Sequence, residues 1–291
     1  GYVDFRQSLT RWLTFDAGLR LDHHSHVGTE WVPQAGLSFV LPRRALLKFS
    51  AAKGFRYPTV RELYMFPPAN PDLKPERLWS YELSFSQQPF GGRLSYGVNV
   101  FLIDGQNLIV RMPVGGRPMN VNTGRIRNAG VELQLDTRII DKAVKWDFGV
   151  NLSVNRSKVL SLSDGKDIFG STVSNTIISD QLNLMRIGEP MYVFYGYVEE
   201  GYDDNGQLVY KDLDGSDGIT PADKTIIGNP NPDCLLNFNT AVSYKGFTLS
   251  AFFQGSIGND IYSLSMASAA YDYSSNANTL REVLYNHWTP E

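Results

Sequence analysis

A period-two alternation of apolar and polar side chains runs through most of this chain and limits the fold more than any other feature. Residues 79–86 read WSYELSFS, and the same alternation covers residues 94–100, 131–136 and 146–155. Such a pattern places the apolar side chains on one face of a β-strand and the polar ones on the other. With residues 2–9 and several weaker segments we count about ten strands, and no stretch keeps a helical period. The predicted fold class is all-β.

The connections between these strands alternate in length. Short connections are expected at residues 10–11, 42–44, 89–92, 140–144 and 245–246. Long connections are expected at residues 23–31, 56–76, 105–127, 158–232 and 256–291. This order predicts an antiparallel meander with tight turns at one end of the sheet and large loops at the other. The longest internal loop, residues 158–232, is expected to be extracellular if the sheet crosses a membrane.

Alternation alone fits two all-β architectures. In a water-soluble sandwich the apolar faces form a shared core, whereas in a membrane barrel the apolar face meets lipid and the polar face lines the lumen. Strands of roughly 10–14 residues, against a usual length of about 5–6, favour the barrel. So do small polar side chains on the polar face and aromatic residues near strand ends, such as Trp12, Trp79 and Trp146. We therefore predict that residues 1–291 are part of a transmembrane β-barrel.

Charge and composition exclude several other classes. The 27 Lys and Arg residues against 30 Asp and Glu give a net charge of −3, which is unsuited to binding nucleic acid. No apolar run reaches the roughly 18–20 residues of a membrane-spanning helix. The single Cys234 excludes an intrachain disulfide and a cysteine-based zinc site. Because we find no nucleophile motif, paired acids or phosphate-binding glycine loop, we expect no enzyme.

Several motifs resemble those of TonB-dependent outer-membrane transporters. Residues 54–64 read GFRYPTVRELY and residues 70–76 read NPDLKPE, similar to the GFRxPxxxELY and NPxLxPE runs of that family. Residues 122–124 (NTG) and 128–132 (NAGVE) match the family's later strand entry. Further segments resemble the SusC/RagA branch, namely residues 187–197, 212–223, 227–233 and 247–261.

This resemblance implies a barrel of about 22 strands around a plug, of which the strands counted here would be less than half. Both ends of the chain read as cuts, so the plug is expected to lie outside it. The resemblance also implies active import of a nutrient across the outer membrane of a Gram-negative bacterium, with the TonB-ExbB-ExbD complex acting on the plug. For the SusC/RagA branch the expected ligand is a glycan or peptide, and the expected partners are a SusD-like surface lipoprotein and outer-membrane lipid. No cofactor is required.

Two other functions stay open at this point. Residues 19–110 look more like the siderophore, haem or cobalamin transporters of the same family. Import of a ferric siderophore, haem or cobalamin is therefore the alternative within the family. A passive outer-membrane pore is the alternative from another class, because a meander with a polar lumen suits it equally well.

An acidic segment within the longest loop is the best candidate metal site. Asp212, Asp214, Asp217 and Asp223 stand at positions one, three, six and twelve of a glycine-containing stretch. Carboxylates at this spacing can converge on a calcium ion, although the EF-hand loop has its third acid at position five and Glu at position twelve. The same residues would also form an ordinary turn rich in Asp and Gly. The sequence leaves calcium and the plain turn equally open.

Residues that contact the imported ligand are expected in the outward loops. Met65 to Pro68 and residues 111–119 fall in two of them, outside the strands. We therefore select Tyr64, Phe66, Arg111 and Arg117 as candidate ligand contacts, since aromatic and cationic side chains exposed on loops are free to bind.

Overall fold

The computed structural model describes residues 1–170, 172–174, 179–216, 218–271, 278–286 and 288–289. The chain divides into two compact units, each described here by itself. The first unit comprises Gly1–Lys166 and Pro232–Gly258, and the second comprises Asp167–Asn231 and Asn259–Glu291. Among the described residues, no helix is long and apolar enough to cross a membrane.

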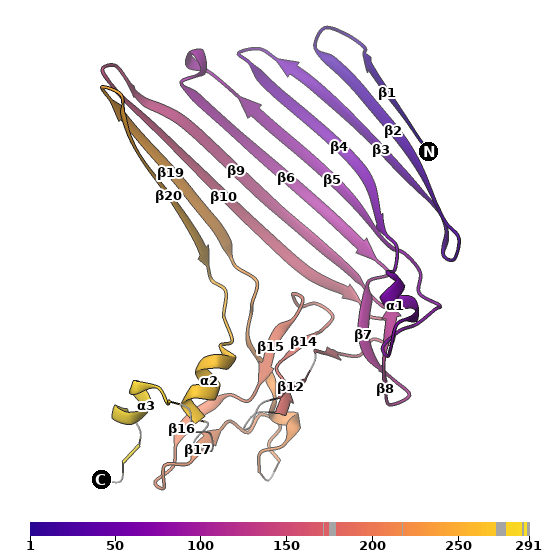
Figure 1. Cartoon of the computed structure of the whole chain (residues 1–291), viewed down its shortest axis with the longest axis vertical. Helices are drawn as coiled ribbons and strands as arrows, with labels where there is room; N and C mark the ends of the chain where they lie inside the picture. The colour runs from indigo at the N-terminus through magenta and orange to yellow at the C-terminus, as the bar shows by residue number, and fades with distance from the viewer. Residues whose placement is uncertain (171, 175–178, 217, 272–277, 287, 290–291) are drawn as a thin grey trace. The chain divides into compact units, whose positions relative to one another are not determined.

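A single ten-stranded sheet dominates the first unit (Figure 1). Its strands are β1 (Tyr2–Ser8), β2 (Leu13–His24), β3 (Gly28–Leu41), β4 (Ala45–Arg56), β5 (Glu76–Gln87), β6 (Leu94–Gln106), β9 (Arg125–Asp141), β10 (Val144–Ser161), β19 (Cys234–Tyr244) and β20 (Phe247–Ile257). They lie side by side in the order of the chain, and every neighbouring pair is antiparallel. The predicted all-β meander is confirmed.

The strand register gives the sheet two chemically different faces. Directly paired residues of antiparallel strands share a face, so a row of pairs can be followed across the sheet. One such row is entirely apolar: Phe15, Leu37, Phe49, Leu83, Val100, Val131 and Val154. A neighbouring row on the other face is entirely polar: Thr14, Ser38, Lys48, Ser84, Asn99, Glu132 and Ser153. The period-two pattern therefore becomes one apolar face and one polar face.

Tight turns and larger connections lie at opposite ends of the sheet, with one departure from expectation. The predicted long connection at residues 23–31 is wrong, because β2 pairs with β3 as far as His24 and Gly28. Between β4 and β5 lies the helix α1 (Val60–Tyr64), and between β6 and β9 lies a hairpin of β7 (Ile109–Val114) and β8 (Arg117–Asn122). The turn between β5 and β6 contains the short 3-10 helix η1 (Phe90–Gly92).

The second unit is built from short elements. One sheet joins β11 (Ile168–Phe169), β14 (Asn183–Met185), β15 (Val193–Gly196) and β18 (Thr225–Gly228). Two strand pairs lie beside this sheet in the chain: β12 (Thr172–Ser174) with β13 (Ser179–Gln181), and β16 (Glu199–Tyr202) with β17 (Leu208–Tyr210). The unit also contains a second 3-10 helix, η2 (Pro221–Asp223), and the α-helices α2 (Leu264–Tyr271) and α3 (Arg281–Tyr285). Its core contains the fully buried side chains of Leu184, Met185 and Val193.

The predicted boundaries of the longest loop, residues 158–232, need a small correction. Strand β10 continues to Ser161, where it still pairs with Arg125 of β9, and β19 begins at Cys234. The connection therefore starts several residues later than the sequence suggested, because backbone pairing extends the strand beyond its apolar alternation.

Gly130 of β9 provides a test of this packing. A Cβ atom added there would lie 2.5 Å from Cζ of Phe101 and 2.5 Å from the backbone oxygen of Val154, whereas one added at Gly97 would meet nothing closer than 3.5 Å. Because the Val154 oxygen is held in the sheet, Gly130→Ala should destabilise the full-length folded barrel by about 1–3 kcal/mol. The urea midpoint for loss of the folded form, followed by heat-modifiable gel mobility, measures this effect. Gly97→Ala is the matched control, and equal midpoints for the two variants would contradict the prediction.

Candidate functional site

The connection between β4 and β5 begins with a firmly capped helix. The hydroxyl of Thr59 accepts a hydrogen bond from the Glu62 N–H (3.2 Å), while Oε2 of Glu62 accepts one from the Thr59 N–H (2.7 Å). This reciprocal pair is a capping box and satisfies two N–H groups at the start of α1. Leu63 of the same helix is buried at 2% exposure. The TVREL stretch carries part of the family resemblance. It forms the start of α1, and this helix buries its Leu63 side chain.

Arg56 at the end of β4 joins this helix to the next strand. Its guanidinium donates to both oxygens of Glu62, at 2.9 and 3.1 Å, and its Nε donates to Oε2 of Glu76 at 2.6 Å. The other oxygen of Glu76 accepts from the Ile109 N–H at the start of β7 (2.8 Å). Burial raises the pKa of Glu62, but the bonds from Arg56 and Thr59 outweigh it and leave the pKa below its ordinary value of 4.5. Arg56 thus connects α1 to β5, and Glu76 connects β5 to the β7–β8 hairpin.

Two asparagines fasten the same connection to the β7–β8 hairpin. The Asn70 side-chain amide donates to the Asn120 backbone oxygen (2.8 Å). The Asn122 side-chain amide donates to the Lys74 backbone oxygen (2.8 Å), and its oxygen accepts from the Lys74 N–H (2.6 Å). The residues that carry the family resemblance therefore act as a latch, which we define as Arg56, Glu62, Asn70, Glu76 and Asn122. The latch positions the loops.

The four candidate ligand contacts lie on the two segments that the latch holds. Tyr64 is the last residue of α1 and Phe66 lies just after the helix; they are 54% and 75% exposed. Arg111 on β7 pairs with Asn120 on β8, and Arg117 begins β8; both arginine side chains are exposed. The structure brings the two segments together through the Asn120 N–H, which donates to the Pro68 oxygen at 2.6 Å. The role of these four side chains in ligand binding stays a prediction.

The polar face of the sheet contains a broad hollow with mixed charge. Its volume is about 710 Å³, and its charged lining residues are Asp4, Arg6, Asp16, Lys48 and Glu82. These residues belong to strands β1, β2, β4 and β5, and their side chains lie on the face opposite to the apolar row. A surface of this kind suits water and polar solutes.

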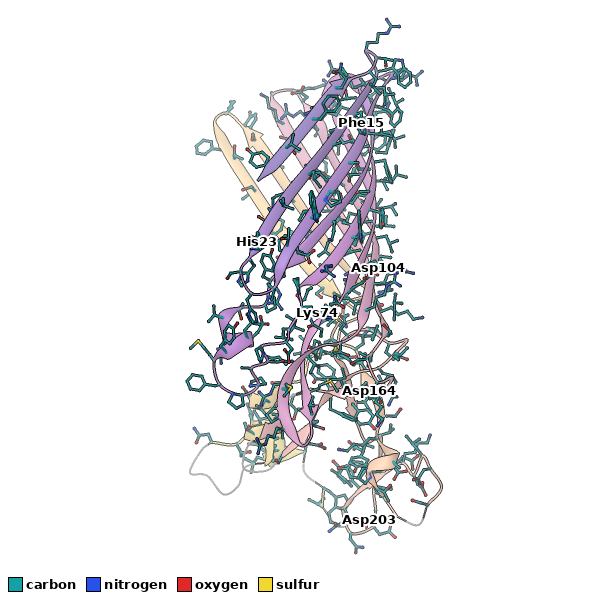
Figure 2. The ribbon with its side chains drawn as sticks, turned by 90° about the vertical axis from the view of Figure 1, so that its right-hand side faces the viewer. Phe15, His23, Lys74, Asp104, Asp164 and Asp203 are labelled. Carbon is teal, nitrogen blue, oxygen red and sulfur yellow. The ribbon has the colours of Figure 1, made fainter. Side chains whose placement is uncertain are left out.

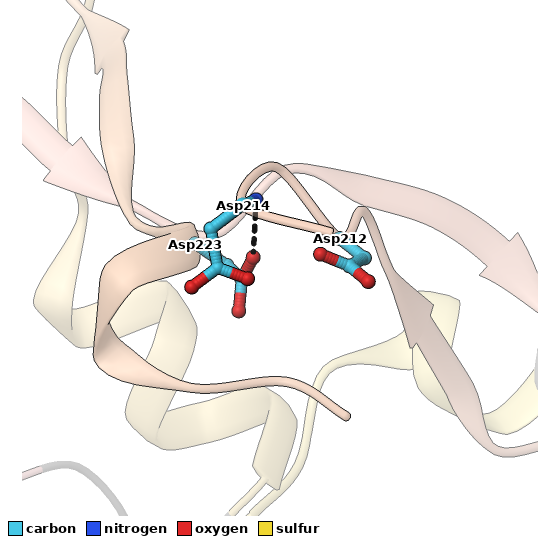
Figure 3. Close-up of side chains that lie close together, drawn as sticks. All are labelled: Asp212, Asp214 and Asp223. Carbon is cyan, nitrogen blue, oxygen red and sulfur yellow. Dashed lines mark hydrogen bonds between the residues drawn. The ribbon is translucent and has the colours of Figure 1, made fainter. Parts of the chain in front are cut away.

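The acidic segment of the second unit brings three of the four predicted acids together. One carboxylate oxygen from each of Asp212, Asp214 and Asp223 lies within 4.8 Å of the others (Figure 3). Asp217 lies outside the described residues. Asp212 and Asp214 are exposed, and each accepts one backbone N–H through Oδ1, from Gly215 (2.7 Å) and Ser216 (2.8 Å). The bond to Asp214 closes an Asx turn and the bond to Asp212 spans one residue more, so both are local turn bonds of the kind that the plain-turn alternative predicts.

Asp223 differs because it is buried and both of its oxygens are occupied. Oδ1 accepts from the N–H groups of Leu213 (2.7 Å) and Asp214 (3.2 Å), and Oδ2 accepts from the N–H (2.7 Å) and hydroxyl (3.4 Å) of Thr220. A carboxylate has about four lone-pair sites, so Asp223 has none left for a cation. The Thr220 N–H, followed by that of Leu213, lowers the pKa of Asp223 below its ordinary value of 3.8.

The donor chemistry nevertheless fits calcium in part. All three acids offer the hard oxygen ligands that calcium prefers, and Asp212 and Asp214 would hold the ion through the oxygens that accept no backbone N–H. Asp223 would have to give up backbone bonds to join them. Calcium binding here therefore stays a prediction, whereas the organising role of Asp223 follows directly from its hydrogen bonds.

Two charged clusters near the loop-bearing end were not found from the sequence. Glu30, 3% exposed, accepts from Arg77 and from Lys53 (3.0 Å). Asp104, 7% exposed, accepts from Arg125 and Arg127. In Figure 2, Asp104 lies toward the end of the sheet opposite to Phe15. Aligning the strands by their alternation would have shown that Arg125 and Arg127 share one face, but the cross-strand partner follows only from the register.

The family model and the relatives that match this chain point to the same family of proteins. The family described as "TonB dependent receptor-like, beta-barrel" matches residues 1–252. The chain is 29% identical over 243 residues to TonB-dependent receptor P3 of Formosa agariphila, covering 76% of this chain and 24% of that protein. It is 25% identical over 141 residues to the vitamin B12 transporter BtuB of Photobacterium profundum, covering 46% and 23%. The chain thus spans about a quarter of the length of the relatives it matches.

Solved structures show the same fold. The RagAB peptide transporter superposes on 89% of this chain, and on 32% of its own, with a TM-score of 0.73 at 20% identity. The siderophore receptor PirA from Pseudomonas aeruginosa superposes on 87% of this chain and 39% of its own, with a TM-score of 0.52 at 15% identity. At these identities the likeness concerns the fold alone.

The role of Asp223 gives a prediction for the full-length protein. Asp223→Asn should raise the rate of proteolytic nicking between residues 205 and 225 several-fold, because the amide loses one acceptor oxygen and the negative charge. Asp214→Asn is the control, since asparagine preserves an Asx turn, and it should change nicking little. If Asp223 alone organises the loop, chelation with EDTA leaves wild-type nicking unchanged. Faster nicking that calcium reverses would instead establish the calcium site.

Proposed function

Because this chain belongs to the family of TonB-dependent receptor β-barrels, we propose that it forms part of an active importer of a glycan- or peptide-type nutrient. Proteins of this family lie in the outer membrane of Gram-negative bacteria. The apolar face of the ten-stranded sheet therefore meets lipid, and the polar face lines the barrel. The family comprises receptors and transporters rather than enzymes. The observation that carries the proposal is this match over residues 1–252, combined with a meander that has one apolar and one polar face.

Two observations support a peptide or glycan as the ligand class. Residues 187–261 contain the segments that resemble the SusC/RagA branch. The higher TM-score, 0.73 against 0.52, belongs to a structure described as a peptide transporter rather than to a siderophore receptor. Import of a ferric siderophore, haem or cobalamin is the second candidate. It is favoured by the likeness of part of the chain to a vitamin B12 transporter.

The proposed importer has two kinds of partner. The TonB-ExbB-ExbD complex would act on a plug that is not part of this chain. A SusD-like surface lipoprotein would cover the loop-bearing end, as the resemblance to the SusC/RagA branch implies. The long connection between β10 and β19, whose acidic segment Asp223 organises, is the segment we expect to be extracellular.

Uptake measurements in cells test the importer against the pore. Cells that produce the full-length protein should accumulate labelled oligopeptides or oligosaccharides, and disruption of TonB should abolish that accumulation. A passive pore would give uptake that does not depend on TonB. Accumulation of ferric siderophore or cobalamin in the same assay, without peptide or glycan, would establish the second candidate.

The exposed loop side chains give a sharper prediction. Phe66→Ala, or the double change Arg111→Ala and Arg117→Ala, should lower the initial rate of uptake at limiting ligand several-fold, because each removes a contact without touching the latch. Phe90→Ala is the matched control. Phe66 and Phe90 are 75% and 77% exposed, with φ of 58° and 55°, but Phe90 lies in a tight turn at the opposite end of the sheet. Equal uptake rates for the Phe66 and Phe90 variants would contradict a ligand contact at Phe66.

A further inference from the structure

A cluster of cations lies just beyond the apolar part of the lipid-facing surface. The row Val100, Val131, Val154 is followed along the strands by the row Leu102, Ala129, Arg156 and then by the row Asp104, Arg127, Lys158. Successive rows lie two residues apart, so all of these side chains share one face of the sheet. Arg125, paired with Gln106, extends the same face by two more residues. We call Arg125, Arg127, Arg156 and Lys158 the basic belt.

The position of the basic belt coincides with the depth of lipid headgroups. On β6 the apolar residues of this face run from Leu94 to Leu102, a strand length of about 27 Å, or about 21 Å across the membrane at a tilt of about 40°. That height is close to the roughly 25 Å apolar band of outer-membrane barrels. Asp104 and Arg127 follow immediately, within the layer of about 5–8 Å that headgroups occupy on each side. The row of Asp104, Arg127 and Lys158 therefore begins where the hydrocarbon ends, and Arg156 lies one row nearer to the apolar residues.

A buried carboxylate holds two of these cations in fixed orientations. Oδ1 of Asp104 accepts from Nε of Arg125 (2.6 Å), and Oδ2 accepts from Nη2 of Arg125 (2.7 Å) and of Arg127 (2.8 Å). The Asp104 side chain is only 9% exposed, whereas those of Arg125 and Arg127 are 45% and 44% exposed. Each guanidinium has five N–H donors, so most donors of the pair remain for an external acceptor. One carboxylate thus orients two arginines and neutralises only one of them.

The remaining members add to the positive charge. Arg156 forms an exposed ion pair with Asp233 at 2.9 Å, and pairs of this kind are weak in water. Lys158 is exposed and forms no ion pair within the part of the chain that the structure describes. Four cations against Asp104 and Asp233 give a local net charge of +2. Guanidinium groups held in a fixed orientation suit the paired oxygens of a phosphate group.

We propose that the basic belt binds the phosphate groups of lipids in the outer leaflet. Its depth, excess positive charge and preset arginine orientation all match a phosphorylated lipid headgroup. The bound lipid would pack its chains against the apolar rows directly below, on β6, β9 and β10. This inference rests on the outer-membrane location of the family and not on the imported ligand.

Binding of a defined lipid to the purified full-length transporter tests the proposal. The probes are phosphorylated lipid A and the same lipid A with its phosphates removed, compared by native mass spectrometry in detergent. The wild-type protein should prefer the phosphorylated form roughly tenfold, since charge-assisted hydrogen bonds are about twice as strong as neutral ones. The double variant Arg125→Gln with Arg127→Gln should lose most of this preference. High salt should also reduce it, because the belt is exposed.

Two further variants keep the test decisive if the double variant folds poorly. Lys158→Gln leaves the Asp104 cluster intact and should lower the preference in the same direction by a smaller factor. Arg138→Gln is the matched control, because Arg138 is an exposed strand arginine paired with Asp147 near the turn-bearing end, and it should change nothing. The proposal is overturned if the wild type does not distinguish the two lipids. It is also overturned if the folded double variant keeps the full preference for the phosphorylated lipid.

Discussion

Hydrocarbon offers no hydrogen-bonding partner to a peptide group, and the structure of this chain follows from that constraint. In the ten-stranded sheet every strand is hydrogen-bonded to each strand that lies next to it. Strand β10, for example, pairs with β9 from Lys145 to Ser161. Continuous pairing fixes the register, and the register decides which side chains share a face. The apolar row from Phe15 to Val154 and its polar neighbour are therefore consequences of satisfying the backbone.

Beyond the loop-bearing end of the sheet the backbone no longer forms continuous strand pairs, and side-chain hydrogen bonds hold the connections in place. There the latch replaces strand pairing with bonds from Arg56, Asn70 and Asn122. Leu63 and Leu73, at 2% and 3% exposure, supply the apolar anchor beneath it. Tyr64 and Phe66 extend from this fixed base while remaining exposed. A receptor needs such an arrangement, because rigid support lowers the entropy lost when a ligand binds to its loops.

The sequence predicted the strands and their faces well, because period-two alternation is a local property of residues such as Trp79 to Ser86. It failed at residues 23–31, where polar residues of β2 and β3 pair without any apolar alternation. It also missed Asp104 with Arg125 and Arg127, since contacts between residues more than twenty positions apart depend on register. The acidic loop was recognised as a cluster, but spacing could not show that backbone N–H groups already occupy Asp223.

Asp223 and Asp104 show why a buried acid must be judged by the donors that surround it. Both carboxylates serve as the centre of a local structure, and neither is free. Asp223 is surrounded by backbone N–H groups that point only inward, so its hydrogen bonds end at the loop it organises. Asp104 is surrounded by guanidinium groups, which donate to it on one side and to the exterior on the other. A buried acid of the first kind stabilises a fold, and one of the second kind also prepares a surface for an anion.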